Sequence, residues 1–127
     1  MKRLAVLIGL VLLVVPVLAA EDFTGKWSGA FVVTGQDGST RDETILLDLK
    51  HKGTELTGMA GPSADKQWPL LKGTVDGNKL TFEVQSDRPL IKFVLTFADG
   101  HLKGDATAEL DGEKMSAKVD AQRKVGF

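Results

Sequence analysis

The sequence predicts an all-β protein, an eight-stranded antiparallel up-and-down barrel that follows an N-terminal signal peptide. Three observations predict this fold. The first 20 residues have the layout of a secretory leader, turn residues recur at an even spacing after it, and the segments between the turns alternate apolar and polar residues. No segment shows the apolar spacing of an amphipathic helix.

Residues 1–20 read as a signal peptide. A basic start precedes an apolar run from Leu4 to Leu18, and two alanines precede an acidic pair. The alternative is a retained membrane anchor, which needs about 20 apolar residues. Pro16 and the small residues after it favour cleavage after Ala19 or Ala20. The sequence therefore predicts a single barrel domain over residues 21–127, located in the periplasm or secreted.

The charge and the cysteine content of the mature chain restrict its partners. Cleavage of the leader would remove two of the 16 basic residues, Lys2 and Arg3. The mature chain would then have 14 basic and 17 acidic groups and a net charge of −3. Such a chain has no electrostatic reason to bind nucleic acid. Cysteine is absent, so neither a lipid-modified cysteine nor a disulfide framework is available. We expect a domain that is not stably inserted in a membrane and is held together by its core.

Seven turn signals divide the mature chain into eight short strands. Asp-Gly pairs supply the positive φ angles that tight hairpins need. The signals lie at Gln36-Asp37-Gly38, Lys52-Gly53-Thr54, Gly61-Pro62-Ser63, Asp76-Gly77-Asn78, Ser86-Asp87-Arg88-Pro89, Asp99-Gly100 and Asp111-Gly112.

The segments between these turns place apolar residues on alternate positions, which is the period of a strand with one buried face. The apolar faces are Ile45, Leu47 and Leu49; Leu80, Phe82 and Val84; Ile91, Phe93, Leu95 and Phe97; Leu102, Gly104, Ala106, Ala108 and Leu110; and Met115, Ala117, Val119 and Ala121. A β-sandwich would share this pattern. We favour the barrel because closure removes the edge strands.

Alternation by itself leaves open which face is outside. An outer-membrane barrel needs aromatic girdles and lipid-facing apolar side chains on strands of about 9–11 residues. The chain has no Tyr and only 6% aromatic residues, and Gly or Ala occupies many of the positions that would face lipid. The terminal Phe127 is the one feature typical of such a barrel. We expect the apolar face to point inward.

Two short motifs carry a resemblance to a known family. Phe23-Thr24-Gly25-Lys26-Trp27 resembles the Gly-x-Trp opening strand of the calycin barrels, which comprise lipocalins, fatty-acid-binding proteins and avidins. The segment from Gly53 to Met59 is similar to the third strand of the avidin and streptavidin branch.

The resemblance implies roles for particular residues. In calycins the Trp of the first strand plugs the closed end of the barrel beneath a basic side chain from the last strand, which implies that Trp27 and Arg123 form this structural plug. The positions that bind biotin in avidins correspond to Gly29, Val33 and Met59, which lack the necessary hydrogen-bonding groups. We therefore do not expect biotin as the ligand.

The sequence offers little for catalysis, and we expect neither an enzyme nor a bound cofactor or metal. A nucleophile needs an adjacent oriented base, and the only histidines are His51 and His101. Both lie near strand ends at the same end of an even meander, so an enzyme or metal site that uses the pair is one alternative. Two histidines in wet positions without a placed carboxylate favour an ordinary surface role.

The predicted interior is uncharged and mixes large side chains with very small ones. An eight-stranded barrel is wide enough either to be filled by side chains or to hold one small ligand. Tight hairpins at Gly53, Asp76-Gly77 and Asp99-Gly100 would close the end near Trp27. The longer connections Thr34–Asp42, Gly61–Gln67 and Ser86–Pro89 would surround a mouth at the other end. The small interior residues are Gly29, Gly58, Ala60, Gly73, Gly104, Ala106, Ala108 and Ala117.

We therefore expect an exported, non-catalytic barrel that binds a small, largely apolar molecule at its loop-rich end. Trp68, at the exit of the 61–67 loop, and Arg88, across from it, are expected at the rim. The alternative is a structural or protein-interaction module of the cell envelope with a filled barrel, which includes association with its own copies. The predicted ligand-binding residues are Phe31, Leu47, Trp68, Arg88, Phe93 and Met115.

Overall fold

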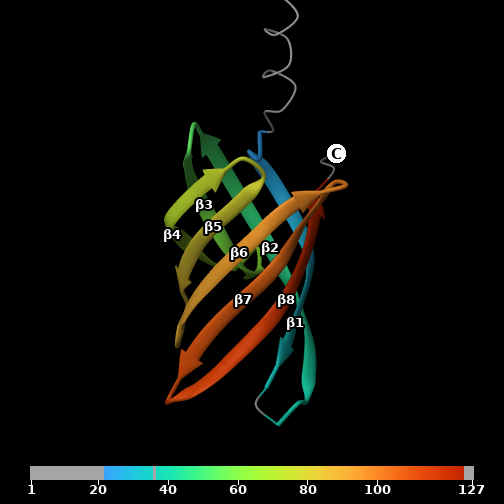
Figure 1. The fold of residues 1–127 in the computed structure, drawn as a ribbon. Helices are drawn as coiled ribbons and strands as arrows, with labels where there is room; N and C mark the ends of the chain where they lie inside the picture. Colours follow the sequence, from blue (N-terminus) through green and yellow to red (C-terminus); the bar gives the residue numbers. More distant parts are fainter. Residues whose placement is uncertain (1–21, 36, 125–127) are drawn as a thin grey trace, which may run out of the picture.

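The computed structural model describes residues 22–35 and 37–124, which form a closed antiparallel barrel with strands in up-and-down order (Figure 1). Each strand pairs with the next, and β1 pairs with β8 to close the ring. The predicted fold class is therefore confirmed. The predicted leader and Phe127 lie outside the described residues. The strands are β1 (Gly25–Thr34), β2 (Thr40–Lys52), β3 (Glu55–Ser63), β4 (Lys66–Asp76), β5 (Lys79–Gln85), β6 (Leu90–Ala98), β7 (His101–Leu110) and β8 (Glu113–Arg123).

Two of the Asp-Gly turns have the geometry that their sequence predicts. Asp99 and Gly100 have φ angles of 52° and 82°, and Asp111 and Gly112 have 54° and 82°. Positive φ at both central residues is the type I′ arrangement, whose twist matches that of the flanking strands. These turns join β6 to β7 and β7 to β8. Residues 22–35 and 37–124 contain no apolar helix of membrane-spanning length.

The prediction of a loop over residues 61–67 is wrong. Strand β3 continues through Gly61 and Pro62 to Ser63, and a two-residue turn at Ala64-Asp65 leads into β4. The register of β3 against β4 shifts between Ala60 and Ser63, so the Gly-Pro pair marks a bulge. Proline is tolerated at such an irregularity because one ladder bond is already missing there. The first connection is also shorter than predicted, because β2 begins at Thr40.

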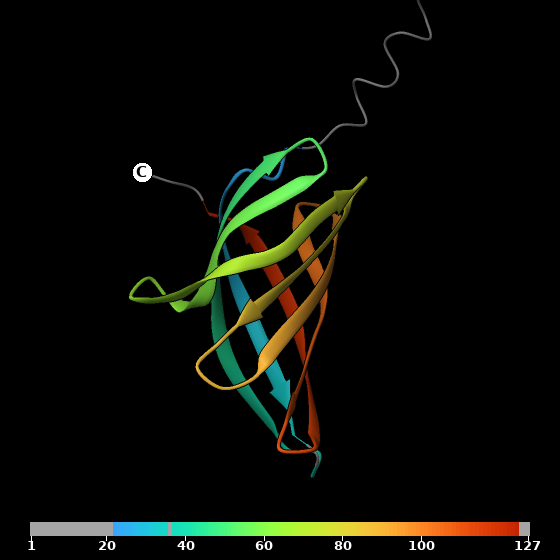
Figure 2. The same ribbon diagram turned by 90° about the vertical axis from the view of Figure 1, so that its left-hand side faces the viewer.

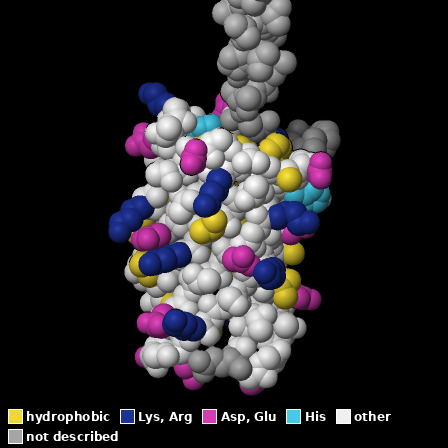
Figure 3. Space-filling model, in the orientation of Figure 1, with side chains coloured by type: hydrophobic (Ala, Val, Ile, Leu, Met, Phe, Trp, Pro, Cys, Tyr) yellow, Lys and Arg dark blue, Asp and Glu magenta, His cyan; other side chains and the backbone are white. Residues whose placement is uncertain are grey.

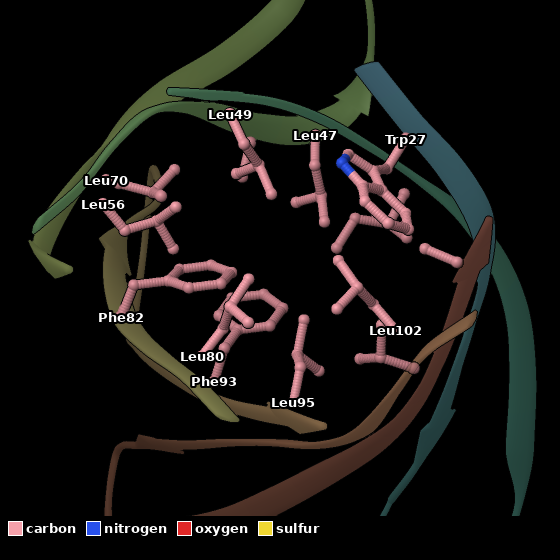
Figure 4. Packing of buried hydrophobic residues seen from close by; sticks show 14 of the residues in the cluster. Trp27, Leu47, Leu49, Leu56, Leu70, Leu80, Phe82, Phe93, Leu95 and Leu102 are labelled. Carbon is pink, nitrogen blue, oxygen red and sulfur yellow. The ribbon is translucent and has the colours of Figure 1, made fainter. Parts of the chain in front are cut away.

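The apolar faces point inward as predicted, and they fill the half of the barrel near Trp27. Phe82, Leu95 and Leu102 have no exposed surface, and Trp27 and Leu47 have almost none. Figure 4 shows these side chains converging from opposite sides of the ring. The closed half is therefore a core filled by buried apolar side chains.

The inward glycines leave no open space, which favours the filled interior of the two alternatives at these positions. A Cβ atom built on Gly104 would lie 2.0 Å from the carbonyl oxygen of Val94, and one on Gly58 would lie 1.9 Å from that of Asp48. The backbone of the neighbouring strand occupies the volume that a side chain would fill. Glycine at these positions allows neighbouring strands to approach and the sheet to curve into a barrel. Gly29, Gly61 and Gly73 have the same close contacts.

The open end of the barrel is slanted. The β1–β2 connection and the β7–β8 hairpin extend beyond the ends of β3–β4 and β5–β6, as both ribbon views show (Figures 1 and 2). One side of the mouth is therefore a tall wall and the other side is low. On the outer face in Figure 3, lysine, arginine, aspartate and glutamate side chains are interspersed over the strands.

Candidate functional site

The open end contains two adjoining hollows. The deeper one, which we call the cup, has a volume of about 160 Å³ and a wall that is mainly apolar. The second, which we call the outer hollow, has a volume of about 270 Å³ and lies along the tall wall. The two share Phe31, Glu43, Ser86 and Ile91. The apolar wall of the cup consists of Phe31, Ile45, Ala60, Pro62, Trp68, Val84, Ile91 and Phe93.

Phe93 separates the cup from the packed core. Its ring is 3% exposed and stacks on that of Phe82, with centroids 4.7 Å apart and an interplanar angle of 15°. Phe31 lies 6.0 Å from Phe93 on the cup side. Ala106 is opposite Phe93 on β7, and its small side chain gives the ring room to lie across the barrel. The cup is therefore shallow and ends in an aromatic floor.

Trp68 forms the low side of the cup and is held by a link between two turns. It lies in β4, directly opposite Ala60 of β3, and the predicted loop before it is a two-residue turn at Ala64-Asp65. Lys66 Nζ lies 5.9 Å from the Trp68 ring centroid and 2.6 Å from Asp87 Oδ2 in the β5–β6 loop. Hydrogen bonding from Lys66 is the main cause that lowers the pKa of Asp87, and the Trp68 side chain adds to it. We call this arrangement of Lys66, Trp68 and Asp87 the mouth clamp.

The mouth also carries charged side chains on the inward-facing side of β2. Arg41 and Glu43 share the alternation phase of Ile45, and both line the outer hollow. Arg41 Nε lies 2.6 Å from Glu43 Oε2. The prediction of an entirely uncharged lining is therefore wrong at the rim of the mouth. There β2 extends beyond the closed ring, and the inner face of the strand meets water.

Arg88 reaches the outer hollow from a loop that is fixed by its own hydrogen bonds. The Arg88 N–H donates to Ser86 Oγ at 3.3 Å, and Ser86 Oγ donates to the Pro89 carbonyl at 2.9 Å. The Gln85 side-chain amide donates to the Arg88 carbonyl at 3.4 Å. The guanidinium side chain is exposed and lines the outer hollow with Arg41.

The opposite end is sealed around Trp27. The Arg123 guanidinium carbon lies 4.5 Å from the Trp27 ring centroid, and its two terminal nitrogens donate to the carbonyls of Thr24 and Asp22 at 2.7 and 2.9 Å. Phe23 is fully buried, and its carbonyl accepts a hydrogen bond from Trp27 Nε1 at 3.0 Å. The segment before β1 is therefore part of the seal.

Each histidine is engaged in contacts away from the mouth. His51 Nδ1 accepts the Phe23 N–H at 3.2 Å and Nε2 donates to the Gly53 carbonyl at 2.8 Å. His101 lies 2.6 Å from Asp120 and 3.3 Å from the amide of Gln122. Neither histidine lines the cup or the outer hollow. Within residues 22–35 and 37–124, no group of three or more His, Cys, Asp and Glu side chains could hold a metal ion.

The predicted ligand-binding residues do not all meet at one place. Phe31, Trp68 and Phe93 line the cup. Arg88 and Met115 line the outer hollow, which Phe31 also reaches. Leu47 belongs to the packed core and lines neither hollow, because it lies one inward position deeper than Ile45.

Sequence reasoning missed several residues of the mouth. Ile45, Val84 and Ile91 were recognised as inward-facing but not as part of the site. Glu43 and Arg41 were not recognised as inward-facing, although they continue the phase of Ile45, Leu47 and Leu49. Met59, which the resemblance equates with a biotin-binding position, pairs with Asp48 and Pro69 on the outward-facing phase of β3.

The eight-stranded antiparallel barrel is consistent with a calycin-like fold. No protein-family model, curated protein or solved structure matches the chain. The function is therefore argued from the geometry of the two hollows.

Proposed function

We propose that this protein is an exported, non-catalytic barrel that binds a small, largely apolar molecule in the cup. The observation that carries the proposal is a mainly apolar hollow with three aromatic rings, Phe31, Trp68 and Phe93, at the open end of a barrel whose other half is filled. Its volume of about 160 Å³ is close to that of an engineered apolar cavity of about 150 Å³ that binds benzene.

Export is supported by the sequence and by the outer surface. Residues 1–20 have the three parts of a signal peptide. Charged side chains of both signs cover the strands on the face seen in Figure 3, which suits a domain surrounded by water. The periplasm and the medium are both compatible with these features. The Gly-x-Trp strand and the segment from Gly53 to Met59 support a place beside the avidin-like calycins, without biotin as the ligand.

The lining of the cup favours binding over catalysis. Its polar side chains are Glu43, Thr44 and Ser86, and the Ser86 hydroxyl is already bonded to the Pro89 carbonyl. A nucleophilic hydroxyl needs a base within hydrogen-bonding reach, and no histidine lines this hollow. The contacts available to a ligand are therefore apolar packing and a few hydrogen bonds.

The alternative of a protein-interaction module has less support. The exposed large hydrophobics within the described ranges are Leu71, Leu90 and Val94, at 40%, 36% and 43% exposure. Polar residues pair with each of them across the sheet: Glu83 with Leu71, Gln85 with Leu90 and Thr81 with Val94. These side chains therefore lack the contiguity of an apolar docking patch.

The test compares two tryptophan substitutions in β6. One places the indole in the cup, and the control places it on the outer face of the same strand. Ile91→Trp adds an indole at the boundary of the cup and the outer hollow, whereas Val94→Trp adds the same ring on the outer face of β6. An environment-sensitive apolar dye should bind the wild type and Val94→Trp alike, and bind Ile91→Trp about tenfold more weakly or worse. Failure of the dye and of a lipid extract to bind the wild type would overturn the proposal.

A further inference from the structure

The charged side chains that line the two hollows are Arg41, Glu43 and Arg88, and two are cations against one anion. Lys66 pairs with Asp87, and Arg41 pairs with Glu43, both at 2.6 Å. Arg88 has no ion-pair partner among the described residues, although it lines the outer hollow beside Arg41 and Glu43. A cation therefore remains beside an apolar cup.

The position of Arg88 relates this cation to the cup. The outer hollow and the cup share Phe31, Ser86 and Ile91, so a molecule seated in the cup extends directly into the hollow that Arg88 lines. Hydrogen bonds between the Arg88 backbone and the side chains of Ser86 and Gln85 hold the loop at this place. A planar guanidinium matches the two oxygens of a carboxylate, and it can form two parallel hydrogen bonds with them.

From this geometry we infer that the ligand is a small apolar carboxylate, with an aromatic or branched aliphatic part in the cup and its carboxylate at Arg88. The inference rests on the proposed function and adds the chemical class of the ligand. An apolar cation is the less favourable guest because Arg41 already occupies Glu43, the acidic side chain of the cup. A neutral guest would gain the cup but not the contact with Arg88.

Three probes of matched shape test the inference: 3-phenylpropionate, its amide and 3-phenylpropylammonium. Their affinities can be measured by calorimetry and by Trp68 fluorescence. The carboxylate should bind about fivefold more tightly than the amide, a modest factor because Arg88 is exposed and screened by water. The ammonium probe should bind most weakly.

Arg88→Gln should lower the affinity for 3-phenylpropionate to that for the amide and leave the amide unchanged. Lys50→Gln removes a positive charge on the outer face of β2, far along the strand from the mouth, and should leave both affinities unchanged. Glu43→Gln releases Arg41 from its partner and should strengthen binding of the carboxylate by about threefold. Circular dichroism checks that each variant is folded.

The outcomes separate the two proposals. If the amide binds and the carboxylate gains nothing over it, or if Arg88→Gln retains the preference, the inference is wrong while the cup remains a binding site. A preference for the ammonium probe would identify a cation site around Glu43 and would also overturn the inference. If neither the dye nor any of the three probes binds the wild type, the proposed function itself fails.

Discussion

A single carboxylate, that of Asp87, connects two of the turns around the mouth. Lys66 belongs to the strand that follows the β3–β4 turn, whereas Asp87 belongs to the β5–β6 loop, and the ammonium of Lys66 lies near the Trp68 ring as well. The mouth clamp thus holds the indole that forms the low side of the cup. Its strength depends on Asp87 being ionised, which makes the clamp sensitive to acid.

The lowered pKa of Asp87 fixes the direction of this sensitivity. Because the folded-state pKa lies below the ordinary value of 3.8, the favourable contacts of the carboxylate are complete above that value and are lost as the pH falls below it. Trp68 fluorescence should therefore be constant from neutral pH down to 3.8 and change only at lower pH. Asp87→Asn should give the low-pH signal at every pH, and Trp68→Phe identifies the contribution of Trp27. A transition near neutral pH in the wild type would contradict the assignment.

At the scale of residues, sequence alternation predicts the site in part. It places Phe93 inside because Phe93 has the phase of Ile91 and Leu95, and it places Phe31 inside because Phe31 has the phase of Trp27 and Gly29. It also includes Leu47, because alternation does not tell how deep along the barrel a residue lies. Arg41 and Glu43 have the correct phase, but their charge suggests a loop unless the projection of β2 beyond the ring is known.

At the scale of elements, inward-facing glycines let β7 and β3 curve against their neighbouring strands. Gly104 of β7 lies opposite Leu95 of β6, and the Val94 carbonyl occupies the place of its absent side chain. Two strands that approach this closely can bend around the core without a clash. The same close contact occurs at Gly58, where β3 meets β2. These glycines therefore shape the barrel and do not enlarge its interior.

Gly104→Ala should destabilise the protein by about 2 kcal/mol, because the added methyl group must displace the backbone of β6. Gly35→Ala is the matched control, since its Cβ would meet the side chain of Asp37 at 3.3 Å, an exposed group that can move. Its effect should be within about 0.5 kcal/mol. Urea denaturation followed by circular dichroism measures both variants. If both variants are equally stable, β6 can move aside for the methyl group at small cost, and the close contact at Gly104 does not require glycine.

The strands themselves follow from the sequence more closely than their connections do. Asp99-Gly100 and Asp111-Gly112 mark the centres of their turns because both residues need positive φ. Gly61-Pro62 carries the same type of signal but lies within β3, where the missing N–H of proline fits a register shift. Local residue types do not distinguish a bulge from a turn when the partner strand is unknown.

At the scale of the whole molecule, Arg123 joins the last strand of the barrel to the first strand and to the segment before it. Its guanidinium covers Trp27 of the first strand and binds the carbonyls of Asp22 and Thr24, which lie 101 and 99 residues away in sequence. These contacts add to the backbone pairing of β1 with β8 at the closed end. The segment around Phe23 is thereby fixed over the core.

Arg123→Gln should lower the free energy of unfolding by about 2 kcal/mol, through loss of the contact with the indole and of the charged hydrogen bonds to two carbonyls. Lys124→Gln removes a neighbouring charge whose backbone N–H bonds to Lys26, and should have little effect. Thermal unfolding with near-ultraviolet dichroism at the Trp27 band measures the difference. A loss as small as that of the control would mean that the Arg123 side chain does not contribute to the seal.

The closed ring and the direction of its strands were predictable because evenly spaced turns leave an antiparallel meander as the simplest arrangement. The slant of the mouth was not, because it depends on how far each hairpin extends beyond the ring (Figure 2). Hairpins of unequal length produce the outer hollow beside the cup. The pattern of apolar residues in one strand does not predict how long the neighbouring strand is.

The pairing of β1 with β8 also has a consequence for biogenesis. Residues 27–34 find their second neighbour only in residues 116–123, so a nascent chain lacks the partner that completes the sheet until β8 has been synthesised. Contacts of such long separation form slowly. Late closure keeps the chain unfolded until β8 is available, and an unfolded chain is the form that the export proposed above requires.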